Sequence, residues 1–124
     1  MNPALYRDGS IEVVCICAPT HPLAKRELVY LDELKNCVWI TREAGSGTRE
    51  AVEAALRPHG VDGIGRLEIG GCEALKQTVA AGNGIAFVSR HAAADQIALG
   101  KLKVIRLAEI EIRSPFYFLL STPA

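Results

Sequence analysis

The sequence lacks an excess of charge of either sign. Fourteen Lys and Arg residues balance fourteen Asp and Glu residues in a chain of 124 residues. No stretch gathers enough basic residues to form the positive surface typical of proteins that bind nucleic acids. We therefore expect that this chain by itself does not bind DNA.

Long hydrophobic runs are absent as well. No apolar stretch approaches the roughly 20 residues that a membrane-spanning helix needs, and residues 1–8 lack the charged start and apolar centre of a secretory signal. Hydrophobic residues nevertheless make up 49% of the chain, which is enough for one folded domain with a core. These features predict a folded cytoplasmic protein that does not bind membranes.

The cysteines and histidines show no spacing typical of metal ligands. No two cysteines form a CxxC pair, and the histidines lie in different connecting segments. We therefore expect neither a metal nor a cofactor, and we expect the thiols to be reduced and structural. The residues concerned are Cys15, Cys17, Cys37, Cys72, His21, His59 and His91.

The glycine-rich segments do not match nucleotide-binding patterns. The segment GSGT (45–48) is followed by Arg49 and not by the Lys that a phosphate-binding loop requires at its own spacing. The segment GNG (82–84) lacks the third glycine of the dinucleotide fingerprint and precedes an apolar strand, so we interpret it as a turn. ATP and NAD are therefore not expected as ligands.

Apolar runs typical of strands alternate with segments whose apolar residues have helical spacing. The run at 11–18 is rich in β-branched residues, which predicts a strand buried on both faces. Asp32 and Ser89 are suited to be helix N-caps. This order predicts an α/β fold with a largely parallel sheet flanked by helices, in which ligands bind outside the carboxyl ends of the strands. We expect strands at 11–18, 38–41, 66–69, 85–88, 102–107 and 116–121, and helices at 31–34, 48–56, 73–81 and 90–98.

Two strand-to-helix junctions have the small residues that suit a ligand site. The first turn of a helix has unpaired N–H groups and a partial positive charge, so it can bind a carboxylate, sulfate or phosphate. In a parallel sheet, both junctions would open on the same side. The candidate ligand-binding residues are Ser46, Gly47, Thr48, Gly70, Gly71 and Cys72.

Each junction also has another interpretation. Ser and Thr are ordinary helix caps that need no ligand, and Cys72 is a small residue beside Gly71. A helix N-terminus can also lower the pKa of a thiol, so a thiol-dependent enzyme that uses Cys72 is an alternative. The sequence shows no base positioned to assist this thiol, and we assign no catalytic residue.

Four segments together resemble the effector-binding domain of LysR-type bacterial transcriptional regulators. They occur in the order and approximate spacing of that family. The resemblance implies a periplasmic-binding-protein-like (type II) domain, in which two α/β subdomains hold a small metabolite between them and two strands cross the hinge. The four segments are HPLA (21–24), GSGTRE (45–50), EALK (73–76) and AAGNGIAF (80–87).

The same resemblance implies how the chain is divided. Residues 1–35 would form a crossing strand and a connector from an incomplete first subdomain, residues 36–110 the second effector-binding subdomain, and residues 111–124 the return crossing strand. Residues 46–48 would line the effector cleft, and the loop at 70–72 would lie nearby. The helix-turn-helix of the family and most of its first subdomain would be missing.

The expected function is therefore ligand sensing for a transcription regulator and not catalysis. The effector is expected to be a small anionic metabolite, and DNA would be bound only through a helix-turn-helix outside this chain. A solute-binding transport component of the same architecture is the alternative, although it would need an export signal. We also expect a homo-oligomer, because the strand at 11–18 would expose an edge that can pair with another chain.

Overall fold

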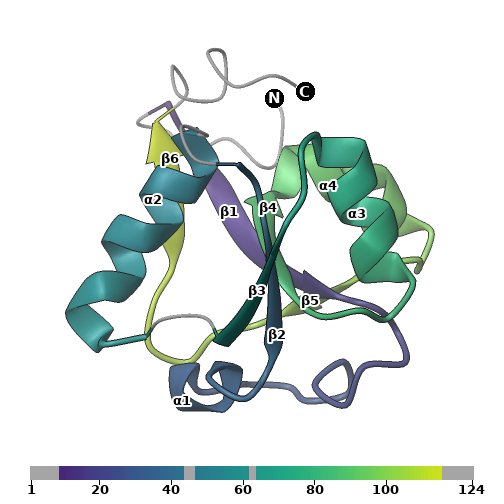
Figure 1. Ribbon diagram of the computed structural model, residues 1–124, viewed down its shortest axis with the longest axis horizontal. Coiled ribbons are helices and arrows are strands. Elements are labelled where there is room, and N and C mark those ends of the chain that lie inside the picture. Colours follow the sequence, from purple (N-terminus) through teal and green to yellow (C-terminus); the bar gives the residue numbers. More distant parts are fainter. Residues whose placement is uncertain (1–8, 44–46, 62–63, 116–124) are drawn as a thin grey trace.

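The strand β1 (Ser10–Cys17) lies in the middle of the sheet and is paired on both edges. One edge pairs antiparallel with β4 (Ala86–Ser89). The other edge pairs antiparallel with β6 (Ile112–Pro115) along the first half of β1 and with β5 (Lys103–Ile105) along the second half (Figure 1). This computed structural model describes residues 9–43, 47–61 and 64–115.

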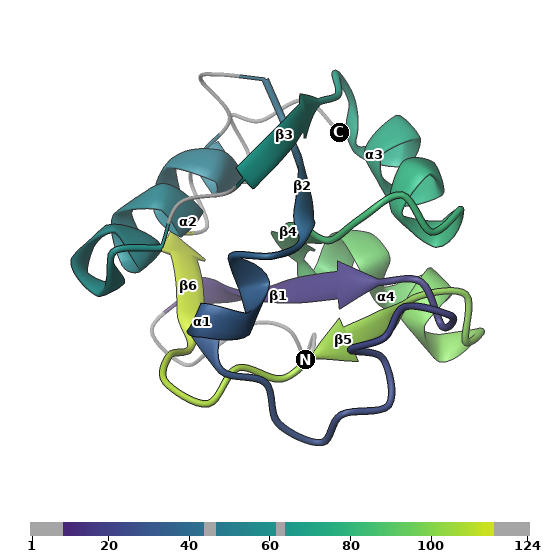
Figure 2. The same cartoon turned by 60° about the horizontal axis from the view of Figure 1, so that its bottom comes forward.

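Two parallel strands extend the sheet beyond β4. β2 (Val38–Thr41) and β3 (Ile64–Glu68) pair with each other. Ile85, just before β4, joins β2 to the rest: the N–H of Ile40 donates to the carbonyl of Ile85 (2.8 Å), and the N–H of Ile85 donates to the carbonyl of Val38 (2.9 Å). The order of the strands is thus β3-β2-β4-β1, with β2 and β3 together on the side away from β5 (Figure 2).

The prediction of a largely parallel sheet needs a correction at β1. The strands β2 to β6 share one direction, but β1 runs opposite to them and is antiparallel to each strand that it pairs with. The apolar run at 11–18 correctly predicted burial on both faces, but a hydrophobic pattern does not specify strand direction. The expectation that this strand exposes an edge is wrong, because both edges are paired. Pairing of β1 with another chain is therefore no longer a reason to expect a homo-oligomer, and the homo-oligomer itself stays a prediction.

Helices cover both faces of the sheet (Figure 1). α2 (Gly47–Leu56), continued by the 3-10 turn η1 (Arg57–His59), lies on one face. α3 (Cys72–Ala80) and α4 (Arg90–Ala98) lie on the other face. The short α1 (Leu31–Leu34) precedes β2. The four α-helices agree in type with the sequence-based prediction, and their ends differ by one residue or less, whereas η1 was not predicted.

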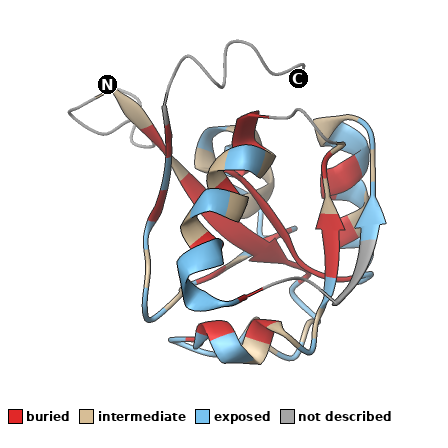
Figure 3. Ribbon diagram, turned by 60° about the vertical axis from the view of Figure 1, so that its left-hand side comes forward, coloured by how far each residue is buried: buried red, intermediate tan, exposed pale blue. Residues whose placement is uncertain are grey.

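Alternate side chains of β1 enter two separate cores. Val13, Cys15 and Cys17 belong to the cluster that includes residues of α2. Val14 and Ile16 belong to the cluster that includes residues of α3 and α4. Successive side chains of a strand point to opposite faces, so one strand supplies both cores. Figure 3 shows buried residues along most of β1.

Capping confirms one predicted helix start and corrects another. Ser89 is the N-cap of α4, and its hydroxyl accepts a hydrogen bond from the N–H of Ala92 (3.1 Å). Asp32, in contrast, is not the N-cap of α1. The N-cap is Tyr30, whose N–H donates to the Glu33 carboxylate (2.9 Å). The short side chain of Asp32 suits a cap, but the capping box fixes the helix start two residues earlier.

The C-terminal strands differ in position from the prediction. β5 covers only part of the run expected at 102–107. The strand expected at 116–121 lies outside the described residues, and β6 precedes it and ends at Pro115. A proline is tolerated there because the last residue of a strand at a sheet margin can lack the N–H that pairing would use. The division of the chain at residues 35 and 110 stays a prediction.

We predict that Gly84→Ala destabilises the fold strongly. A Cβ atom on Gly84 would lie 2.4 Å from the carbonyl oxygen of Val38, and Gly84 has a φ of +148°. Since the Val38 carbonyl belongs to the backbone of β2 and cannot rotate away, the segments would have to separate, at a cost of about 1–3 kcal/mol or more. The matched control is Gly82→Ala, which has a positive φ but no neighbouring atom within 4 Å. Urea unfolding of both variants tests this, and an equal loss would contradict it.

Candidate functional site

The carboxyl ends of β2 and β3 lie side by side. Thr41 is in register with Glu68, and the N–H of Ile69 donates to the carbonyl of Thr41 (2.8 Å). α2 follows β2, and α3 follows β3 after Gly70 and Gly71. The two junctions singled out from the sequence therefore open at the same edge of the sheet, as the parallel arrangement predicted.

The residues predicted at the first junction are only partly within the described chain. Gly47 and Thr48 are the first two residues of α2, and both are buried. Ser46 lies outside the described residues. Thr48 is therefore inside the first helical turn and is not the N-cap that the sequence suggested as one interpretation. Its hydroxyl lies in the turn whose N–H groups lack partners within the helix.

The second junction is formed by glycine backbone. Gly71 is the N-cap of α3 and has a φ of +93°, a conformation that side chains other than glycine rarely adopt. Cys72 is the first residue of α3 and is half-buried. Gly70 lies next to the Glu43 carboxylate, since a Cβ atom on Gly70 would be 3.9 Å from Glu43 Oε2.

Glu43, which the sequence did not single out, places a carboxylate at the N-terminus of α3. It accepts hydrogen bonds from Arg42 Nε (3.2 Å) and Arg42 Nη2 (2.9 Å). The Arg42 guanidinium, with smaller contributions from the backbone of Glu43 and Gly71, lowers the pKa of the Glu43 carboxyl to about 2. An anion belonging to the chain itself thus lies where the sequence predicted a bound ligand.

The lowered pKa has a definite consequence for acid stability. The folded-state pKa of Glu43 lies below its ordinary value of 4.5, so the contribution of this ion pair is fully present at neutral pH. It is lost as the pH falls from about 4.5 towards 2. The Arg42–Glu43 ion pair has one signal in the sequence, namely an Arg-Glu dipeptide directly after the strand at 38–41.

Arg49 connects the start of α2 to the ends of both strands. Its Nη1 donates to the carbonyl of Arg42 (2.7 Å) and lies 3.7 Å from Glu68 Oε1. Its Nε pairs with Glu53 Oε1 at 2.8 Å. Among the described residues, this guanidinium links the two junctions. Arg49 belongs to the segment at 45–50 that resembles the family, but the sequence alone assigned no role to this residue.

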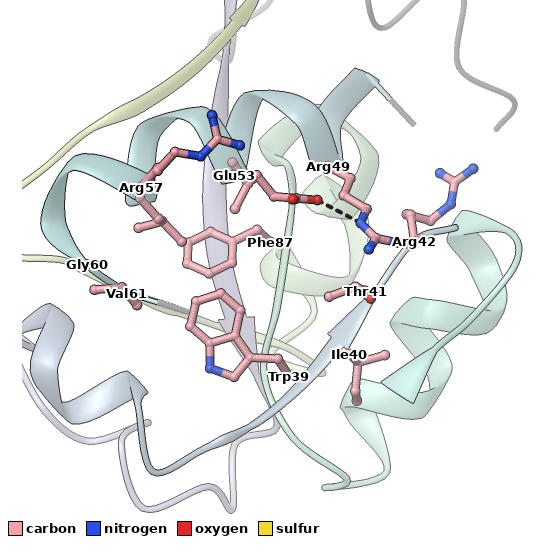
Figure 4. Close-up of a pocket in the computed structure, with 12 residues that line it drawn as sticks. Trp39, Ile40, Thr41, Arg42, Arg49, Glu53, Arg57, Gly60, Val61 and Phe87 are labelled. Carbon is pink, nitrogen blue, oxygen red and sulfur yellow. Dashed lines mark hydrogen bonds and ion pairs between the residues drawn. The ribbon is translucent and has the colours of Figure 1, made fainter. Parts of the chain in front are cut away.

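A cavity of about 350 Å³ lies between α2 and the strands, next to Arg49 (Figure 4). The rings of Trp39 and Phe87 contribute to its lining, with centroids 5.4 Å apart and an interplanar angle of 43°. The indole N–H of Trp39 donates to the carbonyl of Leu34 (2.8 Å), which fixes the orientation of the ring. The Arg49–Glu53 ion pair lines one side of the cavity.

The thiols of β1 suit a structural role. Burial, and to a smaller extent neighbouring thiols, raises the pKa of Cys15 well above its ordinary value and that of Cys17 to about 11. Burial and then Glu33 raise the pKa of Cys37. A high pKa keeps a thiol protonated and a poor nucleophile. Cys15 and Cys17 therefore fill the core and Cys37 packs against it, which agrees with the structural role expected from the sequence.

The described ranges contain neither a cluster of metal-ligating side chains nor a membrane-spanning helix. No group of three or more His, Cys, Asp or Glu side chains in those ranges could hold a metal ion. None of the helices formed by the described residues is long and apolar enough to cross a membrane. The candidate site thus consists of helix N-termini, arginines and carboxylates.

Comparison with known proteins identifies the family. The family model for the LysR substrate binding domain matches residues 7–123. An uncharacterized HTH-type transcriptional regulator, YeiE of Escherichia coli K12, is 43% identical over 94 residues, which are 76% of this chain and 32% of YeiE. The RuBisCO operon transcriptional regulator of Acidithiobacillus ferrooxidans is 34% identical over 117 residues, which are 94% of this chain and 38% of that protein. The chain thus spans about a third of the length of these relatives.

Solved structures confirm the type II periplasmic-binding-protein-like fold. The regulatory domain of Synechocystis PCC6803 CcmR has a TM-score of 0.76 at 35% identity, over 91% of this chain and 53% of that chain. The regulatory domain of MetR from N. meningitidis has a TM-score of 0.73 at 23% identity, over 85% of this chain and 50% of that chain, and supports the fold alone. The resemblance found in the sequence is confirmed: the chain belongs to the LysR substrate binding domain family.

Proposed function

We propose that this chain is the part of a LysR-type transcription regulator that binds a small anionic effector where β2 and β3 end. The observation that carries the proposal is the pair of strand-to-helix junctions at one edge of the sheet, joined in register at Thr41 and Glu68. The CcmR regulatory domain, 35% identical to this chain, has been solved in complex with 2-PG. Membership of the same family supports a small-molecule ligand here.

The first turn of α2 is the preferred position for the anion. Its N–H groups, the hydroxyl of Thr48 and the guanidinium of Arg49 would act together on a carboxylate, sulfate or phosphate group. The first turn of α3 is a poorer position, because the Glu43 carboxylate already lies beside Gly70 and Gly71. An incoming anion would be repelled by Glu43 or would have to displace it from Arg42.

In the whole protein, we propose that effector binding shifts the arrangement of the subdomains and so changes DNA binding by a helix-turn-helix outside these residues. The relatives named above are transcriptional regulators, which favours this role over solute transport and over a thiol-dependent enzyme. An oligomer would transmit the change between DNA-binding segments, in accordance with the homo-oligomer expected from the sequence.

We predict that Thr48→Val weakens anion binding while Thr48→Ser preserves it. The valine keeps the shape of the threonine side chain but removes the hydroxyl donor, so affinity for sulfate and acetate should fall by about tenfold. NMR titration of the parent should shift the amides of residues 47–49 first. Unchanged spectra at about 10 mM anion would count against the site, because helix N-termini with charged donors bind at such concentrations.

We further predict that Glu43→Gln strengthens anion binding roughly three- to tenfold. The substitution removes a negative charge near the proposed site and releases Arg42 from its ion pair, and each effect favours an incoming anion. The matched control is Asp95→Asn on the exposed side of α4, which also removes one negative charge. If both variants gain equally, the effect is one of net charge and not of the position of Glu43.

Finally, we predict that the chain by itself has no useful affinity for duplex DNA. Its formal net charge is zero, so few counterions would be released on binding. Fluorescence anisotropy of labelled duplex at low salt should show no binding at about 10 µM protein. Binding that weakens steeply with added salt would contradict the prediction and reveal a basic surface assembled by folding.

A further inference from the structure

The cavity between α2 and the strands is lined by side chains of the described chain and is partly open to solvent. Its walls come from β2, α2, η1 and β4, and include the side chains of Trp39, Val52, Leu56 and Phe87. A volume of about 350 Å³ falls within the roughly 300–1,000 Å³ of small-molecule sites. Its volume is therefore sufficient for a small organic ligand.

The walls are held so that the cavity cannot close by a simple side-chain rotation. Trp39 is only 4% exposed, and its indole N–H is bonded to the carbonyl of Leu34. Its ring also packs against Phe87 at 5.4 Å. Empty apolar space forgoes the dispersion contacts that a close-packed interior would make. An apolar ligand group would recover those contacts.

The charges around the cavity favour an anionic ligand. The lining contains three arginines, of which Arg42 is paired with Glu43 just outside the cavity, and Arg49 lies near both Glu53 and Glu68. Glu53 is paired with Arg49 at 2.8 Å (Figure 4). Arg57 is exposed, and its guanidinium has no ion-pair partner among the residues that the structure describes. A ligand carboxylate could thus pair with Arg57 without displacing an ion pair formed among the described residues.

We propose that this cavity is a second ligand site, which takes an apolar carboxylate: a ring or branched alkyl group on Trp39 and Phe87, with its carboxylate on Arg57. The site adjoins the small-anion site, since Thr41, Arg42 and Arg49 also line the cavity. It goes beyond that site because the apolar group lies on Trp39 and Phe87 and the carboxylate lies on Arg57. Burial of the apolar group supplies most of the affinity, and the arginine supplies the preference for a carboxylate over a neutral analogue.

Trp39 provides a direct reporter, because it is the single tryptophan of the sequence. Cyclohexanecarboxylate does not absorb where tryptophan is excited, so it can be titrated while fluorescence is recorded. We expect a saturable change with a Kd of about 1 mM, as is reasonable for a ligand of this size. The neutral cyclohexanecarboxamide should bind about tenfold more weakly, since it lacks the charge-assisted hydrogen bond.

Acetate separates this proposal from the small-anion site. Acetate lacks the apolar group, so it should leave Trp39 fluorescence unchanged even where it shifts the amides of residues 47–49. A saturable response to cyclohexanecarboxylate in a protein that ignores acetate and sulfate would support the cavity and contradict the small-anion site. If acetate shifts the amides of residues 47–49 but cyclohexanecarboxylate causes no saturable fluorescence change, the small-anion site is supported and the cavity site is contradicted.

Two variants test the position of the ligand. Val61→Phe fills the cavity from its lining and should abolish the fluorescence response, while acetate binding is retained. Arg57→Gln changes an exposed residue, so it should fold normally and reduce the preference for carboxylate over carboxamide to about onefold to twofold. The matched control is Arg106→Gln, another exposed arginine that does not line the cavity.

An unchanged response in Val61→Phe, with folding verified by its thermal unfolding, would overturn the site. An unchanged carboxylate preference in Arg57→Gln would overturn the assignment of the carboxylate to that residue. If Val61→Phe does not fold, the comparison of Arg57→Gln with Arg106→Gln decides, because both substitutions lie at the surface. Equal carboxylate preference in these two variants would then contradict the proposal.

Discussion

The rest of the structure depends on the pairing of β1 along both of its edges. β1 bonds to β4 on one side and to β5 and β6 on the other, so segments separated by about a hundred residues are held in one sheet. Its alternating side chains also contribute to both cores. With β1 in place, β4 positions Ile85, and Ile85 in turn holds β2 and β3. The candidate site at the ends of β2 and β3 is therefore positioned indirectly by β1.

The strand ends contain a network of charges in which the protein supplies its own anion. Arg42 is buried and pairs with Glu43, while Arg49 bonds to the carbonyl of Arg42 and pairs with Glu53. A helix N-terminus beside arginines attracts anions in general. Here Glu43 partly satisfies that preference in the absence of ligand. An external anion at the α3 N-terminus would have to replace this internal carboxylate, which makes that position poorer than the first turn of α2.

The cavity beside α2 begins at the end of β2, but its apolar wall depends on other contacts. Trp39 must reach the carbonyl of Leu34 with its indole N–H, and it must also pack against Phe87. A large ring held at two points leaves space beside it that the aliphatic residues of α2 do not fill. Polar sensing at the strand ends and apolar binding beside α2 would use different physical interactions, since charge-assisted hydrogen bonds act in one place and burial of apolar area in the other.

The sequence by itself determined the type and order of most elements, because strand and helix periodicity and the cap at Ser89 are local signals. Its ordered segments also identified the family, and its two junctions were correctly expected at one edge of the sheet. Only the tertiary structure decided the direction of β1, the approach of Glu43 to the α3 N-terminus and the cavity beside Trp39. The reason is that strand direction, the pairing of side chains from different elements and the space between packed elements depend on contacts between residues far apart in the chain, on which a local pattern carries no information.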